Sequence, residues 1–363
     1  MGVKVLGADG TASKSAVIAG VDWVVANRGR LGVEALNLSL GGGECSDGTD
    51  AMSRAANRAS SAGLITVAAA GNDGPGRCTI NSPAAAAGAL AVGAMADIAN
   101  GGLLADWRSS RGAPGGRIKP EVMAPGVHVI SARAGTAPGY WRKTGTSMAA
   151  PFVTGVALLM RDARPSLGAS EIKARLRSTA VDWGLRDSGM TFGSRGPDLD
   201  FGWGRLDAYR ALRAAGASGL DGPPPVPTHR VLEGTFTASV RKREFPLEIR
   251  NRCVPIAGSL IMPRWNGYTG SYDFDFFLRD PGGRRIAWGD SIERQDDLDS
   301  KPSTRSDIES PRPAETGTYT VEVEAVEGSG NYFIDVSAGL SDPPPGSPSS
   351  CGPPEPDSSL PSP

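Results

Sequence analysis

The chain has 363 residues, of which 39% are hydrophobic and 21% charged, and its formal net charge at pH 7 is −1. This length is enough for two or three domains with full cores, and the composition is that of a globular protein. The near-zero charge argues against a field that recruits nucleic acid, and no apolar run reaches the length of a membrane span.

The first 216 residues alternate between strand and helix patterns. The opening MGVKVLGADG predicts a strand from residue 3 onward rather than a secretion signal, and a helix is expected near 13–27. An Ala-rich helix is expected over 50–62, and strand patterns occur in EALNLSLG, LITVAAAGN, ALAVGAM and PEVMAPGVHVISA. This order predicts a parallel sheet with helices on both faces, whose active crevice lies at the carboxyl ends of the strands.

A nucleophile is suggested by TGTSMAAPFVTG, residues 144–155. Pro151 is tolerated only near a helix start, and residues 152–160 are almost wholly apolar, which predicts a buried helix. Ser147 would then lie in the first turn, where backbone N–H groups point outward and the helix dipole favours negative charge. An ordinary helix-capping serine is the alternative explanation of this pattern.

Two loops follow strand ends in the same region: SLGGG at 39–43 and AAAGNDG at 68–74. Asn72 in the second loop could direct its side-chain amide into the crevice, as a fixed donor to an oxyanion. Gly-Asn-Asp-Gly is also the composition of a plain turn, so this loop alone leaves both interpretations open.

The pattern changes beyond the first domain, which we assign to 1–216. Residues 217–229 include DGPPPVP and are expected to form a stiff linker, and 341–363 are expected to form a disordered Pro-rich tail. Between them, 230–340 shows alternating strands. TYTVEVEA and NYFIDVSA flank EGSGN, which we interpret as a hairpin turn, and two more strands flank DPGG. This region predicts a small antiparallel β-sandwich.

Four segments in one order, LNLSLGG, VAAAGNDG, KPEVMAPG and GTSMAAPFVTGVALLM, resemble the subtilisin-like serine proteases, or subtilases. The resemblance covers roughly 1–216. Residues 230–340 resemble, more loosely, the pre-peptidase C-terminal domain appended to secreted bacterial proteases. The resemblance implies an α/β fold: a parallel-sheet subtilisin-like domain, incomplete at its N-terminus, followed by a small antiparallel β-sandwich. It also implies a secreted serine endopeptidase that acts on polypeptides, and we expect a monomer.

Carried over position by position, the resemblance assigns Ser147 as the nucleophile of an acyl-enzyme mechanism. It assigns Asn72 as the side-chain donor of the oxyanion hole, partnered by the backbone N–H of Ser147. The positions matching the substrate cleft are Ser39, Leu40 and Gly41 on one edge, and Ala69, Ala70 and Gly71 on the other wall of the primary specificity pocket. Extended substrates pair with edge backbone, so small residues suit these positions. Such walls indicate broad, often apolar tolerance before the cleaved bond, with Asp73 near the rim favouring basic residues slightly.

A serine hydroxyl is a weak nucleophile at neutral pH and needs an adjacent base. The resembled family supplies an Asp and a His, both earlier in the chain than every motif matched here. This chain has two histidines, His128 in PGVHVISA and His229 in the linker, and neither position matches the base. We therefore expect a subtilase that lacks its N-terminal segment and is inactive as given. A non-catalytic, protease-like binding module with an adhesive sandwich is the alternative.

The four cysteines are Cys45, Cys78, Cys253 and Cys351, and none forms a CxxC pair. We expect a Cys45–Cys78 disulfide, because both residues fall in loops after neighbouring strands of the first domain. A Cys253–Cys351 pair would tie the second domain to the tail. Paired cysteines favour an oxidising compartment, and buried free thiols are the alternative.

No cofactor is expected, and no metal site is assigned. Two histidines without clustered cysteines argue against a zinc site. Structural calcium is left unlocated: the acidic cluster of Asp290, Glu293, Asp296, Asp297 and Asp299 is explained better as a solvated loop, and Asp97 is not assigned. The ligand of the sandwich is not identified by its sequence.

Overall fold

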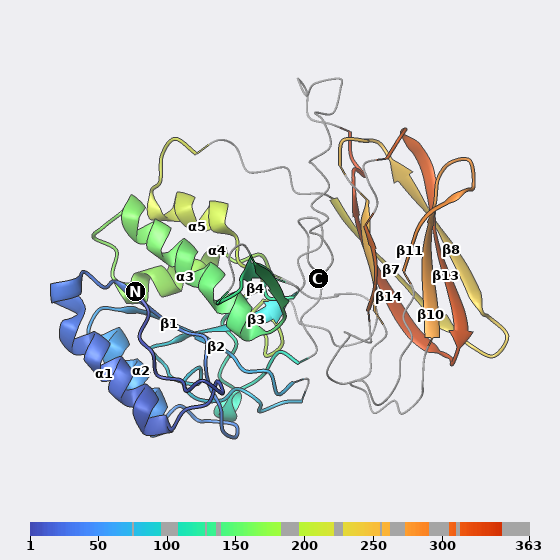
Figure 1. The fold of residues 1–363 in the computed structure, drawn as a ribbon. Helices are drawn as coiled ribbons and strands as arrows, with labels where there is room; N and C mark the ends of the chain where they lie inside the picture. Colours follow the sequence, from blue (N-terminus) through green and yellow to red (C-terminus); the bar gives the residue numbers. More distant parts are fainter. Residues whose placement is uncertain are drawn as a thin grey trace. The chain divides into compact units, whose positions relative to one another are not determined.

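The chain divides into two compact units, one formed by the described residues up to 220 and the other by the described residues from 228 onward (Figure 1). The computed structural model describes residues 1–74, 76–95, 108–127, 129–135, 139–182, 196–220, 228–254, 256–261, 273–289, 305–309 and 313–342.

The first unit is built from a parallel sheet with helices on both faces (Figure 1). Its described helices are α1 (Lys14–Leu31), α2 (Ala51–Ser61), the 3-10 turn η1 (Pro114–Gly116), α3 (Thr146–Ala163), α4 (Ala169–Thr179) and α5 (Ala208–Ala215). Its described strands are β1 (Ala35–Leu38), β2 (Ile65–Ala69), β3 (Leu90–Met95), β4 (Val122–Pro125), β5 (Val129–Ala132) and β6 (Tyr140–Lys143). The order β1-β2-β3-β4 is parallel throughout, and β5 and β6 form a separate antiparallel pair.

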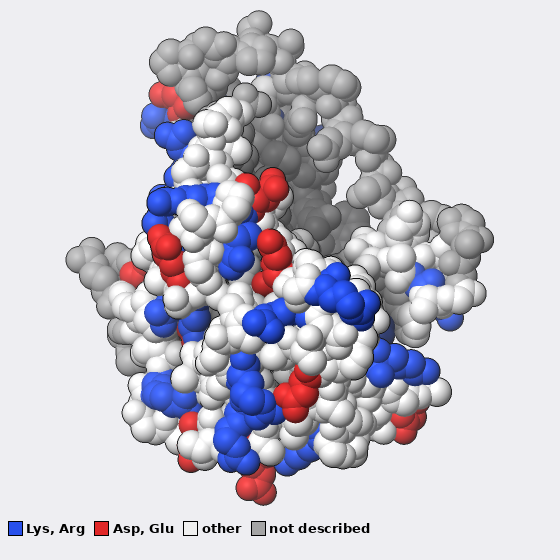
Figure 2. Space-filling view, turned by 90° about the vertical axis from the view of Figure 1, so that its left-hand side faces the viewer, with Lys and Arg blue, Asp and Glu red and all other residues white. Residues whose placement is uncertain are grey.

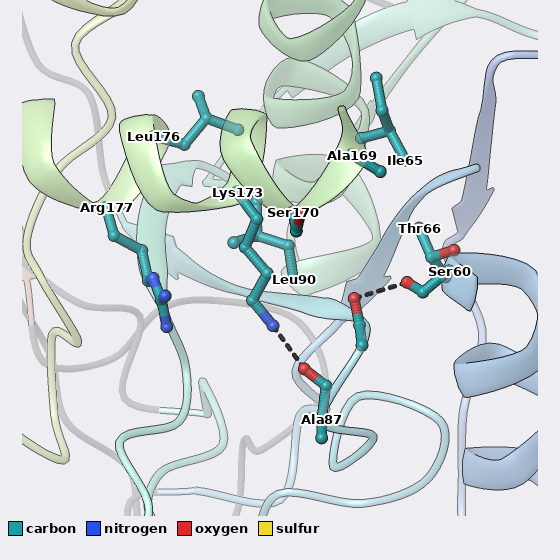
Figure 3. A pocket seen from close by; sticks show the side chains of 11 residues that line it. Ser60, Ile65, Thr66, Ala87, Leu90, Ala169, Ser170, Lys173, Leu176 and Arg177 are labelled. Carbon is teal, nitrogen blue, oxygen red and sulfur yellow. Dashed lines mark hydrogen bonds between the residues drawn. The ribbon is translucent and has the colours of Figure 1, made fainter. Parts of the chain in front are cut away.

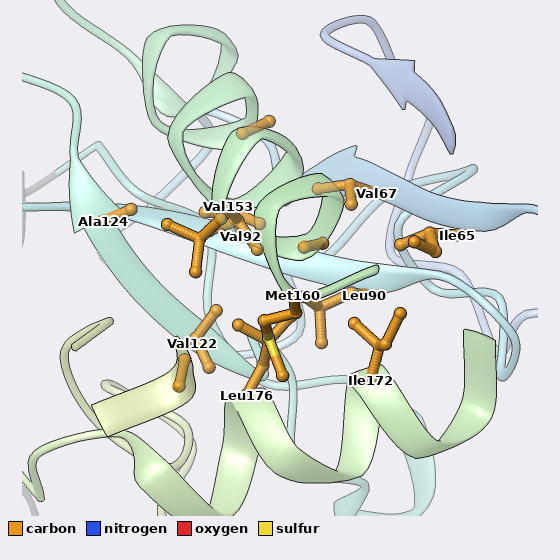
Figure 4. Packing of buried hydrophobic residues seen from close by; sticks show 14 of the residues in the cluster. Ile65, Val67, Leu90, Val92, Val122, Ala124, Val153, Met160, Ile172 and Leu176 are labelled. Atoms are coloured by element: carbon orange, nitrogen blue, oxygen red, sulfur yellow. The ribbon is translucent and has the colours of Figure 1, made fainter. Parts of the chain in front are cut away.

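The sheet is apolar on both faces because successive strand residues point to opposite sides. Val67 and Val92 pack with Val153 and Met160 of α3 on one face, together with side chains of α4 (Figure 4). Ala68 of β2 joins the core on the other face, with side chains of α1 and α2. The predicted α/β class, with a parallel sheet followed by an antiparallel β region, is confirmed.

Two local expectations differ from the structure. Residues 3–8 form no strand, because none of the described sheet strands pairs with them. Helix α3 is not buried on all sides: Phe152 is 44% exposed and Leu159 is 53% exposed, while Val153 and Met160 are fully buried. The exposed pair lies on the side of α3 that does not pack against the sheet. The apolar run therefore predicted a helix buried on all sides, whereas α3 is buried mainly on the side that faces the sheet.

The second unit is a sandwich of two antiparallel sheets in the described residues. Its strands are β7 (Thr228–Phe236), β8 (Lys242–Ile249), β9 (Ala257–Ile261), β10 (Asp273–Arg279), β11 (Arg285–Gly289), β12 (Arg305–Glu309), β13 (Gly317–Glu327) and β14 (Gly330–Ala338). One sheet has the order β11-β10-β13-β8, and the other has the order β12-β9-β14-β7. Their facing sides enclose one apolar core that includes the stacked rings of Phe236 and Tyr332.

The predicted hairpin around EGSGN is wrong, although the strands on either side of it are present. Tyr319 of β13 and Tyr332 of β14 are both buried, as the alternation of apolar residues predicts. The two strands nevertheless belong to different sheets, since β13 pairs with β8 and β10, and β14 pairs with β7 and β9. The connection therefore crosses the sandwich. The turn at DPGG does join a paired hairpin, β10–β11.

A carboxylate is buried on β13 of the second unit. The Glu322 side chain is 0% exposed and accepts from Arg279 Nε at 2.8 Å; Lys242 Nζ lies 2.7 Å from it, and Arg285 also bonds to it. Burial alone would raise the pKa of Glu322, but the hydrogen bonds from these three cations outweigh burial and lower the pKa to about 2. The ionised carboxylate thus ties β13 to β8, β10 and β11.

Cys45 and Cys78 form a disulfide with a Cα–Cα distance of 5.2 Å, which confirms the first predicted pairing. The second expected pairing involves Cys351, which lies outside the described residues.

The surface carries charges of both signs. On the face drawn in Figure 2, Lys and Arg are scattered with Asp and Glu between them rather than gathered into one stripe. In the part of the chain that the structure describes, no helix is long and apolar enough to cross a membrane.

Candidate functional site

The site is assembled where two parallel strands end and one helix begins. Strand β1 runs into residues 39–43, and β2 runs into residues 70–74, so both loops emerge at the carboxyl edge of the sheet. Helix α3 starts beside them, because Gly71 and Asn72 hydrogen-bond to its first residue. The carboxyl edge is where open parallel sheets place their binding crevices.

Ser147 lies in the first turn of α3, two residues after the N-cap Gly145. Its Oγ donates to the carbonyl oxygen of Ser39 at 3.2 Å, and Ser39 Oγ donates to the carbonyl of Ser147 at 2.8 Å. This reciprocal pair fixes the serine against the end of β1. The sequence suggested Ser147 itself as a helix cap, but the cap position is occupied by Gly145.

Gly145 is required at the start of α3 by two observations. Its φ is +150°, and a Cβ placed on it would lie 3.3 Å from both Nδ2 and Oδ1 of Asn72. Any larger residue would therefore be strained and would also press on the Asn72 amide. The Gly-Thr-Ser sequence is thus explained by close packing of the helix start against the β2 loop.

The orientation of Asn72 is set by Thr146. Asn72 Oδ1 accepts from the backbone N–H of Thr146 at 3.0 Å and lies 3.1 Å from its hydroxyl. Thr146 is fully buried, and its hydroxyl also accepts from Gly71 N at 3.2 Å. Since the amide oxygen is used in this way, the hydrogens of Asn72 Nδ2 remain as donors, with no acceptor among the described residues.

The backbone N–H of Ser147 is the second available donor. Of its neighbours in the first turn, Thr146 N donates to Asn72 and Met148 N donates to the Gly145 carbonyl at 3.0 Å. The described contacts assign no acceptor to Ser147 N. A helix N-terminus with an open N–H favours negative charge, so this position suits a developing oxyanion.

Four of the six residues expected to line the cleft have no side chain or only a buried methyl group. Ala69 and Ala70 are 4% and 0% exposed, and their methyl groups belong to the cores on opposite faces of the sheet. Gly41 is exposed, and Gly71 is half-buried. The two loops can therefore present peptide groups to a ligand, as small residues allow.

A cavity of about 460 Å³ lies alongside residues 39–43. Its other side is formed by the N-terminal segment before α1 and by the first turn of that helix. The lining residues are Leu6, Gly10, Thr11, Ala12, Lys14, Val17, Ser39, Leu40, Gly41, Gly42, Gly43 and Met52. The edge formed by Ser39, Leu40 and Gly41 thus borders a hollow that is large enough for a side chain of a bound peptide.

A smaller cavity, of about 260 Å³, lies at the opposite end of the strands, between α4 and the starts of β2 and β3 (Figure 3). Lys173 extends from α4 into it, but its ammonium is bonded to the carbonyls of Ala87 and Ala89 and to Glu121. All three donors of this lysine serve the protein itself. The carboxyl edge therefore remains the candidate site.

Neither histidine belongs to the described part of the first unit. His229 lies in β7 of the second unit, where it pairs with Ser337, and His128 is outside the described residues. The acidic residues considered for calcium, 290–299 and Asp97, are also outside them. Among the residues that are described, no group of three or more His, Cys, Asp or Glu side chains could hold a metal ion.

Comparison with known proteins identifies the first unit. A family model described as "Subtilase family" matches residues 1–204, which is more than half of the chain. The chain belongs to the subtilase family. It is 38% identical over 184 residues to "Subtilisin DY" of Bacillus licheniformis, which covers 50% of this chain and 61% of that protein.

Other similar proteins also overlap with this chain only in part. The chain is 31% identical over 205 residues to "Serine protease AprX" of Bacillus subtilis (strain 168), covering 50% of this chain and 46% of that protein. Among solved structures, "Sphericase" is 29% identical with a TM-score of 0.48, covering 56% of this chain and 66% of that chain. The chain therefore spans about half of the length of the curated relatives that it matches.

Two contributors to the site were missed by the sequence reasoning. The sequence assigns no role to Thr146, whereas its hydroxyl and N–H hydrogen-bond to Gly71 and Asn72 of the β2 loop. The carbonyl of Ser39 accepts the Ser147 hydroxyl, which no side-chain pattern could reveal because the acceptor belongs to the backbone.

Proposed function

We propose that this chain carries the nucleophile and the oxyanion-binding part of a serine endopeptidase that cleaves polypeptides through an acyl-enzyme on Ser147. The observation that carries the proposal is the clamp at the start of α3. Through Thr146, it holds Asn72 beside the helix turn that bears Ser147. Attack by Ser147 Oγ on a peptide carbonyl would place the oxyanion near the Asn72 amide and the Ser147 N–H. Donors fixed in advance for such a charge are usually the largest contribution to catalysis.

Extended substrate would lie between the loop of Ser39, Leu40 and Gly41 and the loop of Ala69, Ala70 and Gly71. Both loops offer backbone with little side-chain obstruction, which suits pairing with a peptide strand. The hollow of about 460 Å³ beside the first loop would then receive a side chain on the acyl side of the substrate.

The general base is the unassigned part of this mechanism. The Ser39 carbonyl that accepts the Ser147 hydroxyl is not basic enough to remove its proton, and neither histidine of the chain is assigned to the site. We propose that a histidine from outside these 363 residues supplies the base. In subtilisin, the family's namesake, loss of the histidine alone lowers turnover about 2 × 10⁶-fold, so we expect this chain alone to be inactive.

We also propose that the protein works outside the cell. The Cys45–Cys78 disulfide supports this, because such bonds persist in oxidising compartments. The sandwich would be an accessory unit, in keeping with its separate core.

Imidazole rescue tests the nucleophile and the missing base together. The full chain is treated with a fluorophosphonate probe, with and without added imidazole, and labelling is mapped by mass spectrometry. The Ser147–phosphorus bond forms, fluoride leaves, and imidazole takes the proton. We expect slow labelling that rises with imidazole concentration, disappears in S147A and persists in S178A, which changes an exposed serine of α4.

Two outcomes would contradict the proposal. Rapid labelling of Ser147 without imidazole would mean that a residue of this chain supplies the base. No labelling at any imidazole concentration, in a chain shown to be folded, would favour the non-catalytic binding module.

A further inference from the structure

The two walls of the proposed cleft converge on one buried side chain, Asn81. It is 4% exposed and belongs to the segment that follows the disulfide loop. A Cβ placed on Gly41 would lie 2.8 Å from Asn81 Oδ1, and a Cβ placed on Gly71 would lie 2.8 Å from Asn81 Nδ2. One amide group therefore spans the space between the two walls.

This amide is held in place by its neighbours. Asn81 Nδ2 donates to Asp73 Oδ2 at 3.0 Å, and Asp73 N donates to the buried hydroxyl of Ser110 at 3.1 Å. A carboxylate only accepts hydrogen bonds, so the nitrogen of Asn81 must be the atom that faces Asp73. The carbonyl of Ser82 accepts from Gly42 N at 3.1 Å, which fastens the same segment to the first wall.

Asn81 thus forms a floor between the two walls that leaves little depth for a side chain, and this floor is polar. Asn81 Oδ1 is buried and has no hydrogen-bond partner among the described residues. An aromatic or long apolar side chain pressed against this carbonyl would offer it no hydrogen-bond donor and would keep water away from it. Such a side chain would also have to push out an amide that Asp73 holds.

We propose that Asn81 closes the primary specificity pocket, so that the residue before the cleaved bond is small: Ala, Ser or Gly. This deepens the proposed function and rests on it, because it takes the two loops as the walls of that pocket. The small residues of the walls alone predicted that many apolar side chains would be accepted before the cleaved bond. With Asn81 as the floor of the pocket, we expect only small side chains to be accepted.

The test uses the full chain with the substitution S147C, which supplies a nucleophile that needs no histidine. The thiol attacks a chloromethyl ketone, the sulfur–carbon bond forms, chloride leaves, and the thiol proton goes to solvent. Rates are measured by intact mass for Ala-Ala-Pro-Ala and Ala-Ala-Pro-Phe chloromethyl ketones. Chloroacetamide measures the reactivity of the thiol without a peptide. Peptide mapping confirms that residue 147 is the one modified.

We expect the Ala reagent to react at least about tenfold faster than the Phe reagent, the scale on which a pocket discriminates by size. Adding N81G should bring the Phe rate up to the Ala rate or beyond, and N81A should do so in part. The remote substitution N331G, in β14, serves as the matched control and should leave the ratio unchanged. Thermal unfolding of each variant shows whether it is folded. If N81G is not folded, the test uses N81A in its place.

The outcomes separate this inference from the proposed function. Equal Ala and Phe rates in S147C, or a ratio unchanged by both N81G and N81A, would overturn the role of Asn81. Peptidyl reagents that never outpace chloroacetamide, in any variant, would overturn the cleft itself and thus the proposed function.

Discussion

Removal of the Thr146 hydroxyl tests the clamp that joins α3 to the β2 loop. T146V keeps the shape of a fully buried side chain but loses the bond accepted from Gly71 N at 3.2 Å and the bond to Asn72 Oδ1 at 3.1 Å. Each such bond contributes about 0.5–1.5 kcal/mol net, so we expect the free energy of unfolding of the first unit to fall by about 2 kcal/mol. The backbone bond from Thr146 N to Asn72 is retained, so Asn72 should stay near the helix.

Hydrogen exchange measured by mass spectrometry is the suitable assay, because a chain of two units need not unfold in one step. Peptides from β2 and α3 should exchange about 30-fold faster in T146V, which corresponds to 2 kcal/mol. T66V is the matched control: Thr66 is also a buried threonine, but its hydroxyl makes one bond, to the Leu64 carbonyl at 3.3 Å. T146S should restore most of the protection. An effect of T146V no larger than that of T66V would refute the clamp.

Three further predictions concern stability. Because the pKa of Glu322 is lowered, its contribution to the stability of the second unit is complete above about pH 4.5 and is lost as the pH falls toward 2; we expect this contribution to be about 2 kcal/mol. E322Q should remove this pH dependence from the hydrogen exchange of β13. If the exchange of β13 depends on pH in the same way with and without E322Q, Glu322 is not its cause. The Cys45–Cys78 disulfide closes a 33-residue separation, so the double variant C45S/C78S should lose about 3–4 kcal/mol in the first unit, and a loss below about 1 would count against the loop-entropy argument. An expressed fragment of residues 230–340 should unfold cooperatively on heating, because it encloses its own core; absence of a transition would show that it depends on the rest of the chain.

Much of the first unit was predictable because its signals are local. Continuous apolar strands such as β2 imply a sheet buried on both faces, and their alternation with helices implies parallel order. The failures arise where the outcome depends on partners distant in sequence. Residues 3–8 have the composition of a strand but find no neighbour to pair with, and Leu159 is apolar but lies away from the sheet.

The site shows the same division. Ser147 and Asn72 could be suggested from motifs, because their residue types and spacing are tied to chemistry. Asn81 could not, since an asparagine before Ser-Pro has the composition of any turn. Its importance comes from where Gly41 and Gly71 lie in space. The β13–β14 connection was misjudged for a related reason: a Gly-rich link between alternating strands fits a hairpin and a crossing between sheets equally well.

The crossing from β13 to β14 has a consequence for the resistance of the second unit to proteolysis. Both strands lie inside their sheets, flanked by β8 and β10 in one and by β7 and β9 in the other, and only two residues connect them. Local unfolding of an edge strand in either sheet leaves the β13–β14 connection intact. No long unfolded segment is therefore released before the whole unit opens. Digestion by a peptidase would have to wait for both sheets to separate at once. The unit would therefore be consumed at the slow rate of global opening rather than at the faster rate of fraying.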